Sequence, residues 1–291
     1  MEPIEFPLKN KIILITGGAS GIGLSLTKQC LELGARVLVA DLHSSSALES
    51  ASNSNVLFVQ SDVTRWSDFA KIFEACEQKW NDVPDAYGIC AGLFEPPFSN
   101  FWQDPEQDVG YKQVDVNVDH PIKLTRLAIK KSLGRGKRAS VCIISSIAGI
   151  SGNIAAPLYC ATKHAIVGFV KSMTTSETFT GVKVTAICPG LVNTPLIDKQ
   201  KVEQFSFKED ASLTPDEVAT HMVPLIQEKK YGCGTILEIS KAGPRVIPPW
   251  NIDPPAGTGT GLKKEEVEAG AKALLSPILR KLEAEKLSPK L

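Results

Sequence analysis

Short apolar runs rich in β-branched residues alternate along the chain with longer segments whose apolar positions repeat with a helical period. This alternation is typical of βα units arranged around a parallel sheet. Seven runs predict strands, at Lys11–Thr16, Arg36–Ala40, Val56–Gln60, Ala86–Cys90, Ser140–Ser145, Lys183–Ile187 and Thr235–Ile239. Their nearly continuous hydrophobicity suits strands that are covered on both faces. The pattern predicts a doubly wound α/β fold with a seven-stranded parallel sheet and helices on both faces.

The amphipathic segments between these runs predict helices, at Gly21–Leu33, Arg65–Trp80, Asp108–Leu133, Pro157–Thr178 and Pro215–Glu228. Before the last of them, Thr214, Pro215 and Glu217 stand in the order of an N-cap, a first-turn proline and an early acidic residue. Residues 191–213 mix a proline, charges and two phenylalanines, which indicates a mobile helical flap.

The composition shifts after Gly243, first to a segment rich in proline and glycine and then to a Lys/Glu-rich helix at Lys263–Lys286. We expect one dinucleotide-binding and catalytic domain over residues 1–243 and a C-terminal extension over residues 244–291. The sequence leaves three arrangements of the extension open: it covers the substrate cleft, it lies across a neighbouring subunit, or it is partly free.

The 291 residues are 43% hydrophobic, and Lys+Arg balance Asp+Glu at 32 each. This balance argues against nucleic acid or an anionic membrane as a partner. The chain starts with acids and prolines and contains no apolar run of about 18 residues, so we expect neither a signal peptide nor a membrane span. Seven scattered cysteines without metal-ligand spacing predict reduced core residues, no metal site and a cytoplasmic protein. Pro289-Lys290-Leu291 leaves a peroxisomal address as the alternative.

The first strand runs into the turn Thr16-Gly-Gly-Ala-Ser-Gly-Ile-Gly23, which precedes a helix. Glycines there let the backbone approach a pyrophosphate, and the helix N-terminus supplies amide hydrogens and a positive dipole. The turn residues Gly17, Ser20, Gly21, Ile22 and Gly23 are therefore candidates for binding a dinucleotide.

Two aspartates follow the next strands. Asp41 closes the second strand, where an acid accepts hydrogen bonds from ribose hydroxyls and repels a 2′-phosphate, so the sequence favours NAD over NADP. Asp62 and Val63 follow the third strand and bracket an adenine ring in one interpretation; in the other, Asp62 only completes a turn.

Tyr159 and Lys163 stand four positions apart, so they project from one face of a helix. A nearby ammonium favours the phenolate, and the pair predicts a general base whose pKa is lowered from about 10. His164 points to a different face and is interpreted as a packing residue.

The glycine turn, Asp62, Ala91-Gly92, Asn117, Ser146, Tyr159, Lys163 and Pro189-Gly190 occur in the order and spacing of one family. Over about Leu8–Gly243 the chain resembles the short-chain dehydrogenase/reductases, which have a Rossmann fold. The segments around Ser146 and Tyr159 look like the NAD-dependent 15-hydroxyprostaglandin dehydrogenase type, a local likeness that carries no substrate.

This resemblance implies a catalytic tetrad. Tyr159 would exchange a proton with the substrate oxygen, and Lys163 would lower the pKa of the tyrosine and hold the nicotinamide ribose. Ser146 would hydrogen-bond the substrate oxygen, with Ser145 as the alternative, and Asn117 would hold a proton-relaying water.

The resemblance also implies that Ala91, Gly92, Pro189, Gly190, Val192 and Thr194 contact the cofactor. Cys90 departs from the family, which usually has asparagine there, and we expect a local effect on stability. By the same resemblance we expect a homodimer or homotetramer.

Apolar residues predict the walls of a substrate pocket, chiefly Phe94, Ile147, Ile154, Leu191, Leu196 and Phe205. The sequence therefore predicts an NAD-dependent oxidoreductase that interconverts a secondary alcohol and a ketone on a bulky, largely apolar molecule such as a terpenoid, steroid-like, lipid or polyketide compound. An NADPH-dependent carbonyl reductase and a non-catalytic dinucleotide-binding regulatory protein remain the alternatives.

Overall fold

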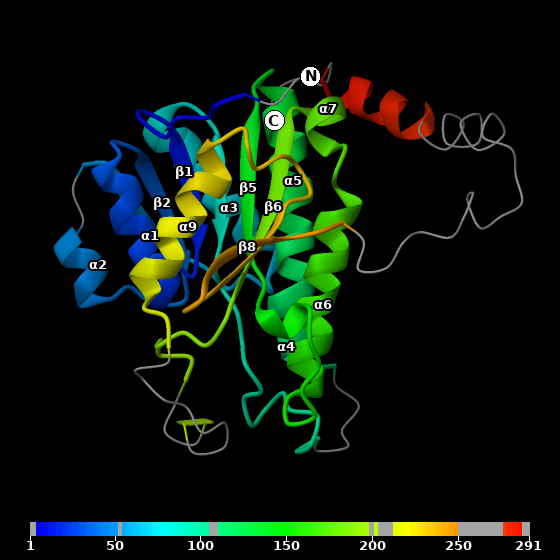
Figure 1. Cartoon of the computed structure of the whole chain (residues 1–291). Coiled ribbons are helices and arrows are strands. Elements are labelled where there is room, and N and C mark those ends of the chain that lie inside the picture. Colours follow the sequence, from blue (N-terminus) through cyan, green and yellow to red (C-terminus); the bar gives the residue numbers. More distant parts are fainter. Residues whose placement is uncertain are drawn as a thin grey trace, which may run out of the picture.

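A computed structural model describes residues 4–51, 54–104, 110–197, 201–202, 212–249 and 276–286. Their centre is one sheet of eight strands in the order β3-β2-β1-β4-β5-β6-β7-β8 (Figure 1). The strands are β1 (Ile12–Thr16), β2 (Arg36–Asp41), β3 (Val56–Gln60), β4 (Ala86–Ile89), β5 (Ala139–Ile144), β6 (Val182–Pro189), β7 (Ile236–Ser240) and β8 (Gly243–Ile247). Strands β1 to β7 pair in parallel, which confirms the predicted α/β fold class.

Helices cover both faces of this sheet. They are α1 (Gly21–Glu32), α2 (Ser46–Ala51), α3 (Trp66–Trp80), α4 (Lys112–Val114), the π-helix η1 (Asp115–Asp119), α5 (His120–Gly134), the 3₁₀ helix η2 (Ile147–Gly149), α6 (Pro157–Ser172), α7 (Ser176–Thr180) and α9 (Pro215–Gln227). Helices α1, α2 and α9 lie on one side of the sheet, and α3, α5 and α6 lie on the other (Figure 1).

The residues of the central strands face two cores, one on each side of the sheet. In β1, Ile12 and Leu14 pack in the core under α3, α5 and α6, whereas Ile13 and Ile15 pack in the core under α1 and α9. All five residues of β1 are buried, because successive side chains alternate between two covered faces. The sequence of β1 is therefore continuously apolar.

The predicted number of strands was one too few. The eighth strand, β8, pairs antiparallel with β7 at the edge of the sheet. Its sequence, GPRVI, is too short of apolar residues to form a hydrophobic run. Val246 is 53% exposed. Pro244 is tolerated because an edge strand can lack one N–H donor. An edge hairpin therefore lacks the buried pattern by which the other strands were found.

Two predicted helices were too long. The described part of the segment Asp108–Leu133 divides into α4, the π-helix η1 and α5, and the helix predicted over Pro157–Thr178 ends at Ser172, before the separate helix α7. The helix start at Pro215 is confirmed, because the Thr214 hydroxyl accepts from the Glu217 amide at 3.1 Å and the Thr214 amide donates to the Glu217 carboxylate at 2.6 Å.

The described part of the C-terminal extension is a helix over residues 276–286. Glu285 on this helix forms an ion pair with Arg126 on α5, and Leu282 is buried in the core on that side. The helix lies near α7, at the end of the sheet where the strands begin (Figure 1). Residues 276–286 therefore lie far from the carboxyl ends of the strands.

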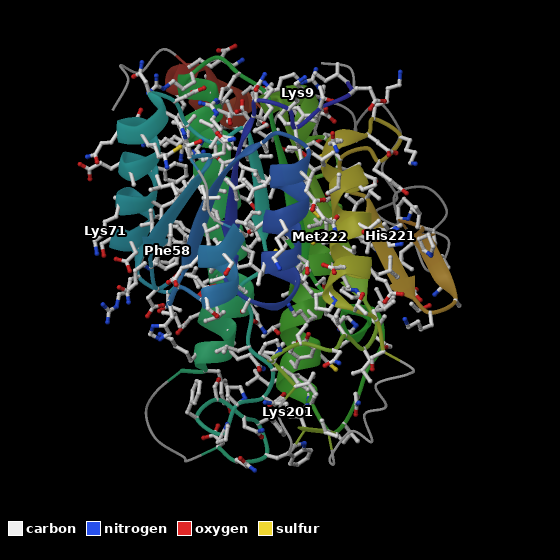
Figure 2. All side chains as sticks on the ribbon, turned by 90° about the vertical axis from the view of Figure 1, so that its left-hand side faces the viewer. Lys9, Phe58, Lys71, Lys201, His221 and Met222 are labelled. Atoms are coloured by element: carbon white, nitrogen blue, oxygen red, sulfur yellow. The ribbon has the colours of Figure 1, made fainter. Side chains whose placement is uncertain are left out.

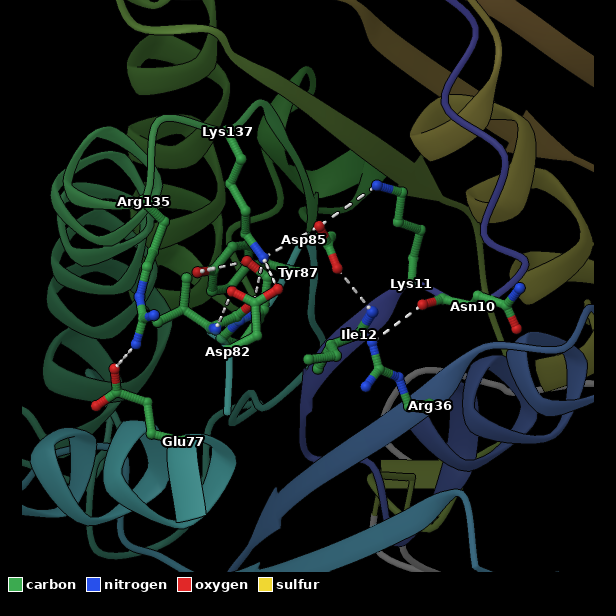
Figure 3. A network of polar contacts seen from close by, with 12 residues as sticks. Asn10, Lys11, Ile12, Arg36, Glu77, Asp82, Asp85, Tyr87, Arg135 and Lys137 are labelled. Carbon is green, nitrogen blue, oxygen red and sulfur yellow. Dashed lines mark hydrogen bonds and ion pairs between the residues drawn. The ribbon is translucent and has the colours of Figure 1, made fainter. Parts of the chain in front are cut away.

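A polar network joins the starts of β1 and β4 to the loop after α5 (Figure 3). The Asp85 carboxylate accepts from the Ile12 amide at 2.9 Å and lies 3.1 Å from Lys137 and 3.6 Å from Lys11. Lys137 also lies 3.0 Å from Asp82. Burial raises the pKa of Asp82, but hydrogen bonds from Lys137 and Val83 lower it more, so the net shift is downward. The ionised Asp82 carboxylate therefore stabilises the folded state. This contribution is fully present above the unfolded-state pKa of about 3.9 and is lost as the pH falls through the lower pKa of the folded state.

We expect Asp85→Ala to lower the free energy of unfolding by about 2–4 kcal/mol, because it leaves the buried Ile12 amide and Lys137 without this acceptor. Asp85→Asn keeps an acceptor for the amide and should lose less. Urea unfolding measures both changes. Lys230→Met, at an exposed ion pair, is the control and should change stability by at most about 0.5 kcal/mol; an equal loss in Asp85→Ala and the control would contradict a structural role for the network.

Candidate active site

The glycine turn joins β1 to α1 at the carboxyl edge of the sheet. Gly17 has a φ of 67°, and a β-carbon there would lie 2.7 Å from the backbone nitrogen of Ala91. Gly21 has a φ of 47° and faces Thr194, whose Cβ would lie 3.5 Å from an added β-carbon. The structure thus brings Ala91 and Thr194, predicted cofactor residues, to the glycine turn.

The start of α1 is open for an anion. Its N-cap, Ser20, is extended and makes no side-chain capping bond, so Ser20 leaves the first-turn amides of Gly21 to Gly23 available to a ligand. Asp41, at the end of β2, is fixed beside this turn, because its carboxylate accepts from the Ala19 amide at 3.0 Å and the Leu42 amide at 2.7 Å. A glycine cradle, uncapped helix amides and an acid at the second strand fit a dinucleotide.

The carboxylate of Asp62, after β3, already has partners within the protein. One oxygen of Asp62 accepts from the Thr64 amide at 2.9 Å and the Thr64 hydroxyl at 2.7 Å, while the other lies 3.6 Å from Lys112. This is the geometry of the alternative, a turn aspartate. Val63 lines a small pocket whose other walls are Thr64, Trp66, Asp115, Asp119 and His120.

Asn117 lies in the π-helix η1, a helical irregularity that is frequent at functional sites. Its amide nitrogen donates to the Leu93 carbonyl at 2.9 Å and the Thr162 hydroxyl at 3.1 Å, and its oxygen accepts from the Leu93 amide at 2.8 Å. Both amide hydrogens are therefore used within the protein, and the side chain has only the remaining lone pair of its oxygen to offer a water. Asn117 thus ties α6 to the loop after β4.

The two serines after β5 have different partners. Ser145 is 1% exposed and donates to the Lys163 carbonyl at 3.0 Å, so its hydroxyl supports α6. Ser146 accepts from the Ala148 amide at 3.1 Å, and its hydroxyl is close enough to the Tyr159 hydroxyl to lower the pKa of the phenol. The geometry favours Ser146 over Ser145 as the serine beside the phenol.

Tyr159 and Lys163 lie together in the first turns of α6. The Lys163 ammonium lies 5.5 Å from the centre of the Tyr159 ring and donates to the Ile144 carbonyl at 3.0 Å. Burial raises the pKa of Tyr159 to about 12, against a smaller lowering by the Ser146 hydrogen bond. Burial also lowers the pKa of Lys163 to about 8. In the chain by itself desolvation dominates the pKa of both groups, so a lowering of the Tyr159 pKa by Lys163 stays a prediction.

The segment after β6 runs to the glycine turn. Pro189 ends β6, and the Gly190 amide donates to the Ile239 carbonyl at 2.8 Å. Val192 is 9% exposed and pairs with Leu213 in an isolated bridge, which leads the chain to Thr194 beside Gly21. At the tetrad, a β-carbon on Gly92 would lie 3.4 Å from the Asn117 oxygen and 3.9 Å from the Lys163 nitrogen.

An aromatic side chain packs against the phenol. Phe94 meets the Tyr159 ring edge to face, with 4.6 Å between ring centres. The other described residues predicted for the pocket are at least one-third exposed, namely Ile147, Ile154, Leu191 and Leu196. Phe205 lies outside the described residues. Lys201, near Phe94, lies at the opposite end of the molecule from Lys9 (Figure 2), so this site occupies the end away from the C-terminal helix.

The sequence reasoning missed two residues near this site. Trp102 donates from its indole nitrogen to the Ile154 carbonyl at 2.8 Å, which joins the loop after β4 to the loop before α6. Glu95 is 7% exposed and accepts from the Tyr159 amide at 2.9 Å. The available signal for Glu95 was a single charged residue inside the apolar run that begins at Leu93.

Cys90, the departure from the family, packs partly buried against the core under α1 and α9. Its amide donates to the Thr16 carbonyl at 3.1 Å. The fully buried Thr16 hydroxyl has no hydrogen-bond partner within the described ranges. An effect of Cys90 on stability stays a prediction.

The comparisons with known proteins agree with this geometry. The family model described as short chain dehydrogenase matches residues 11–204, so the chain belongs to the short chain dehydrogenase family. Among its relatives, the short-chain dehydrogenase/reductase cdmF of Talaromyces verruculosus is 29% identical and covers 75% of this chain and 91% of its own length. The L-fucose dehydrogenase of Bos taurus is 31% identical and covers 72% of this chain and 73% of its own.

A solved structure gives the same fold. The 3-ketoacyl-(acyl-carrier-protein) reductase of Brucella melitensis, determined with NADH, aligns with a TM-score of 0.68 at 24% identity. The alignment covers 80% of this chain and 97% of that one. The fold and the family are thus established, and the chain is an oxidoreductase of this family. Among the residues that the structure describes, no helix is long and apolar enough to cross a membrane, and no cluster of three metal-binding side chains occurs.

Proposed function

We propose that the chain is an NAD-dependent oxidoreductase that interconverts a secondary alcohol and a ketone on a bulky, largely apolar small molecule. The observation that carries this proposal is the meeting of Ser146, Tyr159 and Lys163 with Asn117, beside the glycine turn. A bound nicotinamide dinucleotide would supply the two-electron oxidant or reductant at its C4 carbon.

The chain's own groups would handle the proton. With a pKa of about 12, the Tyr159 hydroxyl is protonated at neutral pH and suits donation to a carbonyl oxygen during reduction. In the reverse direction the phenolate takes the alcohol proton. Ser146 donates a second hydrogen bond to the same substrate oxygen, and the Lys163 ammonium beside the ring stabilises the phenolate.

The substrate class rests on apolar residues predicted to form the pocket and on the ring beside Tyr159. Phe94 packs on the Tyr159 ring, and Ile147 and Leu191 are exposed apolar side chains. Phe101 and Trp102, in the loop after β4, are also exposed and pack edge to face. Such a site favours a large hydrocarbon framework with few charged groups over a free sugar. We therefore expect this chain to convert L-fucose poorly.

Formation of NADH from NAD in the presence of cyclohexanol, menthol or a hydroxysteroid tests the proposed reaction. We expect turnover with at least one of these alcohols, or with the matching ketone and NADH, and much slower turnover with L-fucose. Tight binding of NADH without conversion of any of these alcohols or ketones would favour a non-catalytic dinucleotide-binding protein.

The cofactor preference rests on Asp41. Its carboxylate is fixed beside the glycine turn, and within the described part of the chain no ion pair joins it to a lysine or arginine. A 2′-phosphate there would meet a like charge, so we expect NADPH to bind at least about tenfold more weakly than NADH. The Kd values of both cofactors, from quenching of protein fluorescence, measure this ratio.

Asp41→Asn should narrow this ratio, because it removes the charge and keeps an acceptor for the Ala19 amide. Asp216→Asn, on the exposed first turn of α9, is the control and should leave the ratio unchanged. Tighter binding of NADPH than NADH by the wild-type protein would instead support the NADPH-dependent carbonyl reductase.

A further inference from the structure

Glu95 is a buried carboxylate at the start of the loop that follows β4. It is 7% exposed and has a φ of 38°, in the left-handed region that non-glycine residues seldom adopt. Its amide donates to the Gln113 side chain at 2.5 Å, and its carbonyl accepts from Asn100 at 3.3 Å. The surrounding contacts therefore hold this residue in a conformation that costs about 1–3 kcal/mol, which is a pattern found at functional sites.

The carboxylate of Glu95 caps the helix that carries the candidate acid/base. One oxygen accepts from the Tyr159 amide at 2.9 Å, and the other accepts from the Phe101 amide at 3.3 Å. Tyr159 is the third residue of α6, whose N-cap Ala156 makes no side-chain capping bond. Pro157, the first helical residue, has no N–H to donate. A residue 64 positions earlier thus supplies the cap that the helix lacks.

Glu95 and its neighbour Phe94 hold Tyr159 at its backbone and at its ring. A carboxylate at a helix N-terminus is favourable because it faces the positive end of the helix dipole. The neighbouring Phe94 packs edge to face on the Tyr159 ring. One residue earlier still, Leu93 exchanges two hydrogen bonds with Asn117. Three consecutive loop residues therefore connect Tyr159, at the start of α6, with Asn117 in the π-helix.

We propose that Glu95 is a positioning residue, which orders the first turn of α6 and thereby holds the Tyr159 hydroxyl where it can exchange a proton with the substrate. This inference rests on the proposed function of Tyr159. Glu95 acts through its bond to the Tyr159 backbone and exchanges no proton with the substrate. A misplacement of about 1 Å at a reacting group lowers a rate by on the order of 10²-fold, so the loss of the cap should be visible in kcat.

Three variants separate the cap from the backbone conformation. Glu95→Ala removes the acceptor, and Glu95→Gly removes it while allowing a positive φ without strain. Glu95→Gln keeps one oxygen that can accept from the Tyr159 amide. We expect kcat for the alcohol converted by the wild-type protein to fall about 10- to 100-fold in the first two variants. In Glu95→Gln it should stay within about fivefold of wild type, since the bond to the Tyr159 amide is kept and only the charge and the acceptor for the Phe101 amide are lost.

Hydrogen exchange gives a readout that needs no substrate. In the NADH complex, the amides of residues 158–160 should exchange faster in Glu95→Ala and Glu95→Gly than in wild type, with protection restored in Glu95→Gln. The Kd of NADH should stay within about twofold, since the glycine turn lies on other elements. Unchanged exchange at these amides, or an equal loss of kcat in Glu95→Gln and Glu95→Ala, would overturn the proposal.

A double variant distinguishes a failure of this inference from a failure of the proposed function. If Glu95 acts through Tyr159, adding Glu95→Ala to Tyr159→Phe should lower kcat no further. Wild-type turnover by Tyr159→Phe would refute the proposed function, and the exchange data would still decide whether Glu95 caps α6. Loss of turnover in Tyr159→Phe together with wild-type kcat in Glu95→Ala would refute the positioning role alone.

Discussion

Tyr159→Phe should lower kcat by on the order of 10²- to 10⁴-fold in both directions of the reaction, the usual contribution of general acid/base catalysis. The substitution removes only the hydroxyl, which lies beside Ser146. The ring that packs on Phe94 is kept, and so is the backbone bond to Glu95. The loss should therefore reflect chemistry, with little change in folding.

Steady-state kinetics and NADH titration together measure this effect. The Kd of NADH should stay within about threefold of the wild-type value, because the residues proposed to bind the pyrophosphate are unchanged. Tyr231→Phe removes a hydroxyl from a tyrosine on the loop after α9 and is the matched control, with an expected kcat equal to wild type. Retention of more than about one-third of wild-type kcat by Tyr159→Phe would remove the tyrosine from the mechanism.

Gly23→Ala should abolish tight cofactor binding and destabilise the fold. An added β-carbon would lie 2.1 Å from the Gly17 carbonyl oxygen, 2.7 Å from the Gly17 carbonyl carbon and 3.0 Å from the Gly18 Cα atom. All three atoms are backbone, so no flexible side chain can move aside. Thr27 closes the turn further, since its hydroxyl donates to the carbonyls of Gly18 and Gly23.

Gly23→Ala should push the turn open and move its backbone amides away from the position of the pyrophosphate. Each lost hydrogen bond to a charged group costs about 1.5–3 kcal/mol, so the Kd of NADH should rise by about 10- to 100-fold for each bond. Urea unfolding should show a loss of about 1–3 kcal/mol or more, as for other overpacked sites. Gly134→Ala is the matched control, because a β-carbon there meets nothing within 4 Å. Wild-type affinity for NADH in Gly23→Ala would show that the dinucleotide does not bind at this turn.

Much of the fold was visible in the sequence because buried parallel strands leave continuous apolar runs. All seven such runs are strands in the structure, and the Thr214 cap is present. The edge strand β8 was missed because only burial on both faces creates the run that identifies a strand. The π-helix at Asn117 was also invisible, since its sequence has ordinary helical periodicity.

The candidate site was predictable to the extent that it depends on local spacing. Tyr159 and Lys163 share a helix, and the glycines share a turn, so their sequence separation fixes their geometry. The pKa of Tyr159 was not predictable, because it depends on burial by elements distant in sequence. The contact from Glu95 to Tyr159 was hidden for the same reason, as 64 positions separate the two residues.

The most direct test is a crystal structure of the protein with NADH and the ketone that the turnover assay identifies. The account predicts that the dinucleotide pyrophosphate lies on the amides of Gly21 to Gly23, with the carbonyl oxygen about 2.6–3.2 Å from the Tyr159 hydroxyl and its carbon facing nicotinamide C4. A ketone oxygen directed away from Tyr159, or a dinucleotide bound outside the glycine turn, would contradict it.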